Sequence, residues 1–214
     1  MKQSVAYQLD LLTERCPALA VCRNDIKEAF EAIKECYKAG GKLLIAGNGG
    51  SAADAEHIVG ELMKSFVLER GIGDEFSRAL RAVDAEMGAV LAKSLQGALP
   101  AIALDGHPSL STAYQNDCEP LLCFAQQVNG YGKGGDAFLG ISTSGNSKNV
   151  LYAAVVAKAK GMKVLGLTGQ TDSRLSAIAD ICIKVPQSKT HLVQEYHLPV
   201  YHTLCLMLEQ EFFN

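Results

Sequence analysis

The sequence predicts an α/β fold in which helices cover both faces of a parallel β-sheet. Short apolar runs bounded by glycine, proline or polar residues alternate with stretches of helical periodicity, as they do in βαβ units. Two of these runs end directly in glycine- or serine-rich turns, and parallel sheets bind ligands outside the carboxyl ends of their strands. The chain of 214 residues is long enough for one such domain, and we predict a single domain over residues 1–214.

Composition and charge exclude several classes of protein. A net charge of −3 gives no basic footprint for nucleic acid, and no apolar run approaches the roughly 18 residues of a membrane span. Acidic residues follow the start too soon for a secretory signal peptide. The 7 scattered cysteines include no CxxC pair, which is typical of reduced thiols. We therefore expect a soluble cytoplasmic protein with no nucleic-acid or membrane partner.

Residues 1–38 are predicted to be helical, ahead of the first strand. Apolar residues recur at helical spacing in two groups, with a break near Cys16-Pro17 and a second start at Asn24. Helices in this position have no sheet face of their own to cover, so we expect them to form an oligomer interface. The apolar positions are Val5, Leu9 and Leu12, then Ile26, Ala29, Phe30 and Ile33.

The remaining strands and helices alternate along the chain. Segments 43–46, 100–104, 136–141, 163–168 and 181–185 have the length and flanking residues of strands. The predicted helices are 109–116, 121–129, 150–160, 175–179 and 191–213, with Pro199 kinking the last one or marking a junction. Alanine, leucine and alternating charges over residues 71–99 predict a helical insertion that projects from the core near the pocket mouth.

The first turn lies between the strand at Leu43 and the helix that follows it. The strand ends at Gly47-Asn48-Gly49-Gly50, and Ser51 then stands at the expected N-cap position. Free backbone N–H groups and the helix dipole would converge there on an anion, which glycine lets approach closely. His57 and Glu61 follow as an i, i+4 pair on one helix face, although a solvated helix face often gives the same spacing. A phosphate cradle beside this pair favours a sugar-phosphate enzyme.

The second turn, STSGNS over residues 142–147, follows the third strand directly. Its hydroxyl groups and backbone N–H groups would surround a phosphate with neutral donors at a helix N-terminus. No GxxxxGK[ST] motif is present, so nucleotide hydrolysis is disfavoured. The alternative is an ordinary turn whose serines cap the helix, and the other glycine turn at the same sheet edge argues against it.

Three segments resemble a known family. The turns AGNGGSAADAEH and LGISTSGNS and the late helix VQEYHLPVYH are similar to those of the SIS (sugar isomerase) domain, and more narrowly of the phosphoheptose isomerases. The resemblance covers essentially the whole chain. It implies a three-layer αβα fold with a five-stranded parallel sheet, and a homotetramer whose active sites are lined by more than one subunit. It also implies isomerisation of sedoheptulose 7-phosphate to D-glycero-D-manno-heptose 7-phosphate with one zinc ion per subunit.

The resemblance also implies the site residues by position. Substrate would be contacted by Asn48, Gly49, Gly50, Ser51, Glu61 and Gln194, and its phosphate held by Ser142, Thr143, Ser144 and Ser147. The metal ligands would be His57, Glu61, Gln194 and His202. The residue pattern agrees in part, since His57 and Glu61 make a plausible half-site that a distant helix can complete. Glutamine is an uncommon zinc ligand, so the identity of the metal depends on the resemblance.

Two further histidines, His107 and His197, lie outside the expected set of metal ligands. Members of the family often carry an aspartate in the loop after the second strand, and counting back from Asn116-Asp117 this position falls on His107. His107 is therefore expected to contact the sugar. Asp105, two residues earlier, is an alternative for that role, and a third alternative is that neither residue takes it. His197 could also supply an imidazole, but nothing in the spacing requires it as a ligand. We interpret it as a residue that supports the ligands from behind or packs in the core.

The isomerisation that the resemblance implies requires few catalytic groups. Moving a carbonyl between C1 and C2 needs a base for a carbon-bound proton, an acid for oxygen and a stabiliser for the enediolate. Our hypothesis assigns Glu61 as the base and His202 as the acid, with the metal polarising the carbonyl.

Other readings come from different functional classes. A non-catalytic SIS-domain tetramer, of the kind that associates with a replication initiator, keeps both turns but tends to lose the His/Glu/His set, which is present here. A sugar-phosphate-sensing regulator is disfavoured because no helix-turn-helix precedes the domain. An isomerase of another sugar phosphate remains an alternative.

Overall fold

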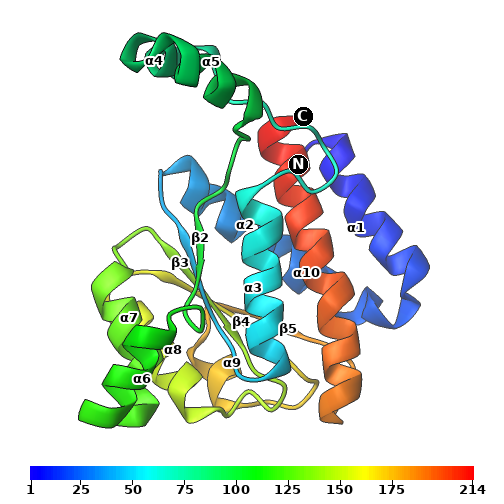
Figure 1. Cartoon of the computed structure of the whole chain (residues 1–214). Helices are drawn as coiled ribbons and strands as arrows, with labels where there is room; N and C mark the ends of the chain where they lie inside the picture. Colours follow the sequence, from blue (N-terminus) through cyan, green and yellow to red (C-terminus); the bar gives the residue numbers. More distant parts are fainter.

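The centre of the molecule is a parallel sheet of 5 strands in the order β2-β1-β3-β4-β5 (Figure 1). The computed structural model describes residues 1–214. The strands are β1 (Leu43–Ala46), β2 (Ala101–Ala103), β3 (Ala137–Ile141), β4 (Lys163–Thr168) and β5 (Ile181–Lys184). All neighbouring strands pair in parallel, and every residue of β1 and β3 is buried. These two strands are continuous apolar runs because helices cover both faces of a parallel sheet, so that both sides of each strand are buried.

Alternate strand residues enter two separate cores. Leu43 and Ile45 point into one core, and Leu44 and Ala46 into the other. The first core lies under α1 (Gln3–Arg15), α2 (Arg23–Lys38), α3 (Gly50–Met63) and α10 (Thr190–Phe213). The second lies under α7 (Cys123–Tyr131), α8 (Lys148–Ala159) and α9 (Arg174–Ile178). The predicted three-layer αβα architecture with a five-stranded parallel sheet is confirmed.

The N-terminal segment breaks where the sequence predicted. A short 3₁₀ turn, Pro17–Cys22, separates α1 from α2 because proline 17 lacks the N–H that a continuing helix needs. Both helices bury their apolar stripes in the first core, and α1 packs along α10. These helices therefore already have a partner within the chain, and their part in an oligomer interface stays a prediction.

The last helix runs without interruption from Thr190 to Phe213, so Pro199 does not mark a junction. It lies beside α3, and the two helices cross the same face of the sheet (Figure 1). No helix of the chain combines the length and the apolar character that a membrane crossing requires.

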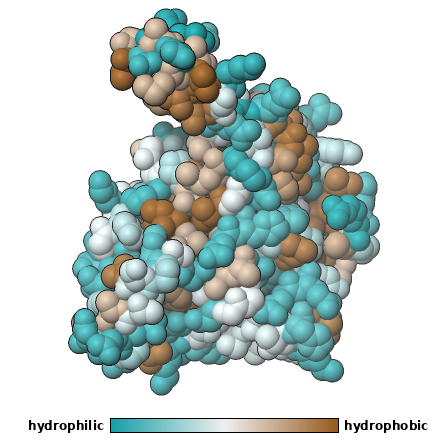
Figure 2. Space-filling view, in the orientation of Figure 1, coloured by the Kyte–Doolittle hydropathy of each residue, from teal (hydrophilic) through white to brown (hydrophobic).

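Residues 71–99 form a projecting unit that we call the arm. It consists of α4 (Asp74–Val83) and α5 (Ala85–Ser94), which pack on each other and stand apart from the body (Figure 1). The helices touch closely at Gly88, where a Cβ would clash with the carbonyl oxygen of Leu80. Apolar side chains gather on the arm (Figure 2). The exposed apolar residues of α4 and α5 include Phe76, Val83, Met87, Val90 and Leu91.

The position expected for the arm was wrong. It connects the end of α3 to the start of β2, and in a parallel sheet that connection lies at the amino edge. The binding turns lie at the opposite, carboxyl edge, so the arm does not stand at their mouth. A bridge between Gly71 and Gln96 closes its base.

Candidate active site

The first turn forms an open helix N-terminus. Gly49 is the N-cap of α3 and has φ +57° and ψ −121°, a backbone conformation that glycine adopts without strain. No side chain caps the helix, and the N–H groups of Ser51 and Ala52 donate to the carbonyl oxygens of Asn48 and Gly49 at 3.0 Å each. The N–H groups ahead of them, at Gly49 and Gly50, are the ones available to an anion. The prediction of Ser51 as N-cap was wrong, because the glycine run lets the helix begin earlier. Ser51 lies buried in the first helical turn.

The second turn presents hydroxyl groups before α8. Ser142 is buried and its Oγ lies 3.0 Å from the Oγ of Ser147, while Thr143 is half-buried and Ser144 exposed. Ser147 is the N-cap of α8, but its side chain makes no capping hydrogen bond. The Ser147 hydroxyl is therefore not used as a helix cap, and the Ser142–Ser147 pair can donate to an anion.

The two turns are joined directly. The Asn48 amide donates to Asn149 Oδ1 at 3.0 Å, and the Asn149 amide donates back to Asn48 Oδ1 at 2.8 Å. Asn48 follows β1 and Asn149 begins α8 after β3, and these two strands are neighbours in the sheet. Asn149 was missed by sequence reasoning, because only strand order places it opposite Asn48. The pair holds both turns at one edge of the sheet.

Gln194 lies at this edge as well. A Cβ on Gly50 would lie 2.5 Å from Gln194 Nε2, so the amide of α10 packs directly on the first residue of α3. Gln194 and His202 are eight positions apart on a continuous helix, which separates them by about 12 Å along its axis. The structure therefore places Gln194 beside the turns and not beside the other expected metal ligands.

Three other expected ligands gather further along α3, and we call them the His/Glu cluster: His57, Glu61 and His202. His57 Nε2 lies 3.1 Å from Glu61 Oε1, and the rings of His57 and His202 have their centroids 5.0 Å apart. The side chain of Glu61 is 12% exposed and also receives a bond from Lys64 Nζ at 3.1 Å. α3 and α10 thus bring together residues that are far apart in sequence.

His202 is the least satisfied member of the His/Glu cluster. Its Nε2 is buried and has no hydrogen-bond partner. Burial lowers the pKa of His202, and the neighbouring His57 lowers it further, against the opposing charge of Glu61. The ring is therefore neutral near pH 7 and offers a nitrogen with no partner inside the protein.

A buried ion pair supports the same stretch of α3. Arg70 donates from Nε to Glu209 Oε1 at 2.8 Å, and from its two terminal nitrogens to the carbonyl oxygens of Glu61 and Leu62, each at 2.9 Å. Glu209 also accepts from the backbone N–H of Phe66 at 2.9 Å. Despite burial, which raises it, these bonds hold the pKa of Glu209 below its ordinary value. Arg70 thereby caps the end of α3 at Glu61.

The His/Glu cluster fits a divalent metal in donor chemistry. Imidazole nitrogen and carboxylate oxygen are ordinary zinc ligands, and the spacing of His57 Nε2 and Glu61 Oε1 allows both to contact one ion. The unpaired Nε2 of His202 is a third donor beside them. As placed, no three His, Cys, Asp or Glu side chains of the chain converge closely enough to hold an ion, so the third donor would have to move inward.

Asp105 and His107 occupy the loop after β2. His107 precedes α6 (Pro108–Asp117), its ring lies against Tyr131 with centroids 5.8 Å apart, and its Nε2 is buried without a partner. Burial raises the pKa of Asp105, and the nearby carboxylate of Glu56 raises it further. Asp105 Oδ1 and His107 Nε2 are both buried without a hydrogen-bond partner. Neither residue joins the His/Glu cluster.

His197 is completely buried in α10, as expected for a packing residue. Burial lowers the pKa of His197 to about 4. The imidazole is therefore neutral in the folded protein.

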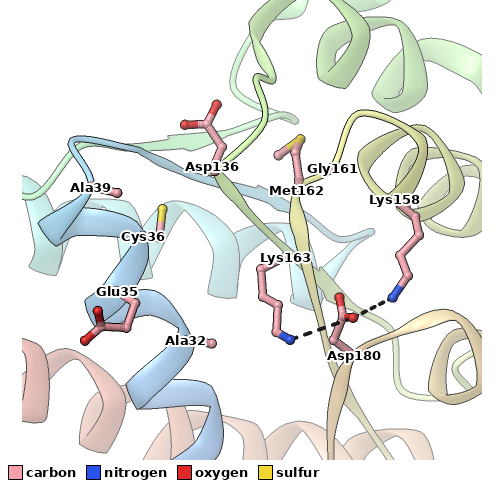
Figure 3. Close-up of a pocket in the computed structure, with 11 residues that line it drawn as sticks. Ala32, Glu35, Cys36, Ala39, Asp136, Lys158, Gly161, Met162, Lys163 and Asp180 are labelled. Carbon is pink, nitrogen blue, oxygen red and sulfur yellow. Dashed lines mark hydrogen bonds and ion pairs between the residues drawn. The ribbon is translucent and has the colours of Figure 1, made fainter.

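A groove of about 570 Å³ lies at the opposite, amino edge of the sheet (Figure 3). Asp180 lies between Lys158, at 2.6 Å, and Lys163, at 3.8 Å. Asp136 pairs with Lys42 at 2.6 Å. Because these charges already have partners, the groove offers no unsatisfied group that calls for a ligand.

Comparisons with known proteins agree with this geometry. A family model described as SIS domain matches residues 18–76 and 83–169. The phosphoheptose isomerase of Akkermansia muciniphila is 32% identical over 214 residues, which is 100% of both chains. That of Aneurinibacillus thermoaerophilus is 38% identical over 180 residues, or 84% of this chain and 78% of its own.

Solved structures give the same result. A phosphoheptose isomerase from Neisseria gonorrhoeae superposes with a TM-score of 0.73 and 30% identity, covering 96% of this chain and 97% of its own. One from Francisella tularensis gives a TM-score of 0.70 and 31% identity, covering 95% and 92%. The chain belongs to the SIS domain family and, within it, to the phosphoheptose isomerases.

Proposed function

We propose that the protein is an isomerase that converts sedoheptulose 7-phosphate to D-glycero-D-manno-heptose 7-phosphate. One observation carries the proposal: α3 begins at an open anion-binding turn and carries a His/Glu pair that meets a third residue, His202, from α10. Its relatives of similar length are phosphoheptose isomerases, which supplies the substrate class. The phosphate would be held by the uncapped N-terminus of α3 and by the hydroxyls of residues 142–147.

The proton transfers can be assigned to this chain's own side chains. The Glu61 carboxylate takes the proton from C1 of the ketose, giving an enediol, and returns a proton to C2 to complete the aldose. His202 moves the proton between the two oxygens, for which a neutral imidazole near pH 7 is suited. The net change moves two hydrogens within the sugar, so no oxidant or reductant is needed.

A zinc ion is part of the proposal. His57, Glu61 and His202 would hold it, and it would polarise the substrate carbonyl when bound. Gln194 is the expected fourth ligand, but within one subunit its amide lies against Gly50. A role for Gln194 as a ligand therefore requires an approach from another subunit or a rearrangement of its side chain.

The same geometry supports the proposal of a homotetramer with shared active sites. Gly50 and Glu61 are eleven positions apart on α3, about 16 Å along the axis. A single sugar phosphate would be served better if one subunit supplied the phosphate turns and another the His/Glu cluster. Exposed apolar side chains on the arm and at Tyr7 and Val21 are available for contacts between subunits. Sedimentation velocity at micromolar concentration should give the mass of four chains, and a monomer would contradict this part of the proposal.

We also place the enzyme in the cytoplasm. All 7 cysteines are free, including the exposed Cys118, which suits a reducing compartment.

The test is an assay of purified protein with sedoheptulose 7-phosphate, with and without a chelator, in which the aldose product is separated and quantified. A panel of other ketose phosphates run in parallel identifies a different substrate. The proposal expects chelator-sensitive conversion of the seven-carbon sugar. Binding of sugar phosphate without conversion of any ketose would favour the alternative of a non-catalytic SIS-domain tetramer.

A further inference from the structure

Glu61 lies in the last turn of α3, where a helix is least well held. The helix ends at Met63, so the carbonyl oxygens of its final four residues have no partner within the helix. The next residue, Lys64, has extended backbone angles, and its N–H makes no bond back to the helix. The carboxylate proposed as the base therefore lies at a helix end that frays unless another group binds its carbonyl oxygens.

Arg70 supplies the hydrogen-bond donors that this helix end lacks. Its guanidinium donates from Nη2 to the carbonyl oxygen of Glu61 and from Nη1 to that of Leu62, each at 2.9 Å. The Leu62 oxygen also accepts from the backbone N–H of Leu99 at 2.9 Å, whereas Arg70 is the only donor to the Glu61 oxygen. The planar fork of an arginine is suited to binding two acceptors in a fixed geometry. The Glu61 carbonyl therefore depends on Arg70 in a way that the Leu62 carbonyl does not.

The arginine is itself held from several directions. Its side chain and that of Glu209 are both 0% exposed, and Nε lies 2.8 Å from Glu209 Oε1. The guanidinium also lies over the ring of Phe213, 4.7 Å from the ring centroid. The backbone N–H of Arg70 donates to Ser65 Oγ at 3.1 Å, and its carbonyl oxygen accepts from the Gly97 N–H at 2.9 Å. A donor with so little freedom defines the position of the carbonyl groups that it binds.

The two histidines of the His/Glu cluster do not depend on this support. His57 lies one turn earlier on α3, and its Nδ1 lies 3.0 Å from the hydroxyl oxygen of Tyr201 on α10. His202 belongs to the uninterrupted helix α10. Loss of Arg70 should therefore displace Glu61 relative to two imidazoles that stay in place.

We propose that Arg70 is a positioning residue, which fixes Glu61 through its main-chain carbonyl group and so holds the carboxylate where it acts as the base. The catalytic part rests on the proposed function. Displacement of a catalytic group by about 1 Å can cost about 10²-fold in rate. Glu209 has a different role, because it neutralises the buried guanidinium and makes no hydrogen bond to Glu61. Stability and positioning can therefore be separated by substitution.

The test compares two variants whose stability and activity should change in opposite order. Glu209→Gln keeps an acceptor for Arg70 Nε and both bonds to the carbonyl oxygens, but it leaves the guanidinium buried without its carboxylate. Its urea midpoint should therefore fall. The double variant Arg70→Met/Glu209→Gln removes both charges, so its midpoint should lie closer to that of the unsubstituted protein.

Activity with sedoheptulose 7-phosphate should show the reverse order. Glu209→Gln should keep most of its kcat, because Arg70 still binds the Glu61 carbonyl oxygen. The double variant should lose about 10- to 100-fold in kcat, as the loss of an orienting partner does. Its KM should change little, because the phosphate turns lie at the other end of α3. Circular dichroism checks that both variants are folded under the assay conditions.

Arg70→Lys gives a second comparison in which the charge is kept. Its ammonium group can neutralise Glu209, but it lacks the planar fork that binds two carbonyl oxygens at once. We again expect a lower kcat with KM little changed.

Amide hydrogen exchange followed by NMR gives a readout that needs no sugar. The amide groups of Glu61 and Leu62 should exchange faster in the double variant than in Glu209→Gln, although the double variant is the more stable protein. Those of Ile58 and Val59 should remain protected in both, because only the last turn of α3 loses a donor.

Equal kcat in the two variants would overturn the positioning role, and so would kcat values that follow the urea midpoints. A lower kcat in the double variant with unchanged exchange at Glu61 would also overturn it, because Arg70 would then act by another route. If exchange at Glu61 is faster but even the unsubstituted protein converts no ketose phosphate, the anchoring of Glu61 stands. The proposed function, and the catalytic part with it, then fails.

Discussion

The amino-edge groove and the His/Glu cluster both contain titratable side chains, but only in the groove do these side chains all have partners. In the groove, Asp136 and Asp180 each have a lysine partner. In the cluster, His202 Nε2 is buried without a partner, and the nearby Asp54 Oδ2 is unpaired as well. The groove has a volume of about 570 Å³, yet nothing in it requires a ligand. The two regions therefore differ in whether their titratable side chains have partners, and cavity volume does not show this difference.

The largest expected effect compares one carboxylate from each region. Glu61→Gln should lower kcat by about 10²- to 10⁴-fold, which is what a general base contributes, with the fold unchanged. Glu35→Gln, in the wall of the groove, should change kcat by less than about twofold, as exposed substitutions do. Both are measured with sedoheptulose 7-phosphate. Equal activity of the two variants would remove the functional distinction between the regions.

The next effect concerns the ion pair that holds the end of α3. Arg70→Met leaves the Glu209 carboxylate buried without its cation, which should lower the free energy of unfolding by about 3–5 kcal/mol. The cost is large because the arginine side chain is 0% exposed. Urea denaturation followed by circular dichroism measures it. A loss comparable to that of a surface pair, such as Lys184→Met beside Asp172, would show that Arg70 does not support this helix end.

A pH effect tests the complete burial of His197. Burial lowers the pKa of His197 in the folded protein to about 4, below the ordinary value of 6.5. Between these two pH values the unfolded chain binds a proton at His197 and the folded protein does not. The stabilisation is complete above pH 6.5 and is lost as the pH falls toward 4. Between pH 7 and pH 5 the loss due to this group should be about 2 kcal/mol.

His197→Phe should remove that part of the pH dependence. Urea denaturation at the two pH values gives the difference directly for both proteins. An unchanged pH dependence in His197→Phe would assign the effect to other groups.

The smallest effect tests the phosphate turn. Ser142→Ala removes one hydroxyl donor, which should raise KM about tenfold while kcat changes little, because the phosphate is bound equally in ground and transition states. Ser188→Ala, at an exposed position, is the control. A fall in kcat without a change in KM would place Ser142 in the chemical step instead.

The sequence was a good guide where structure is local. The two turns and all five strands were predicted because glycine runs, serine runs and apolar segments act over a few residues. The N-cap of α3 was misplaced by two residues, since glycine at position 49 could begin the helix without a side-chain cap. The arm was expected at the pocket mouth, although chain direction in a parallel sheet already places its connection at the amino edge.

Long-range contacts were beyond the sequence pattern. Asn149, Tyr201 and Arg70 carry no motif, and each acquires its role only from the packing of one element on another. Gln194 and His202 are both expected ligands, and within one subunit helix geometry separates them by about 12 Å, so their joint role stays a prediction. Residue spacing predicts which side chains share one face of a helix. Which of them contact each other depends on how the neighbouring helix packs against that face.

The central claim is that Glu61 moves a proton between C1 and C2 of a phosphorylated ketose. Running the conversion of sedoheptulose 7-phosphate in D₂O and analysing the aldose by NMR tests this most directly. Proton transfer through a solvent-exchanging base predicts deuterium at C2 of the product with the unsubstituted protein, and no incorporation above background with Glu61→Gln. Deuterium at C2 in equal amount with Glu61→Gln would contradict the account.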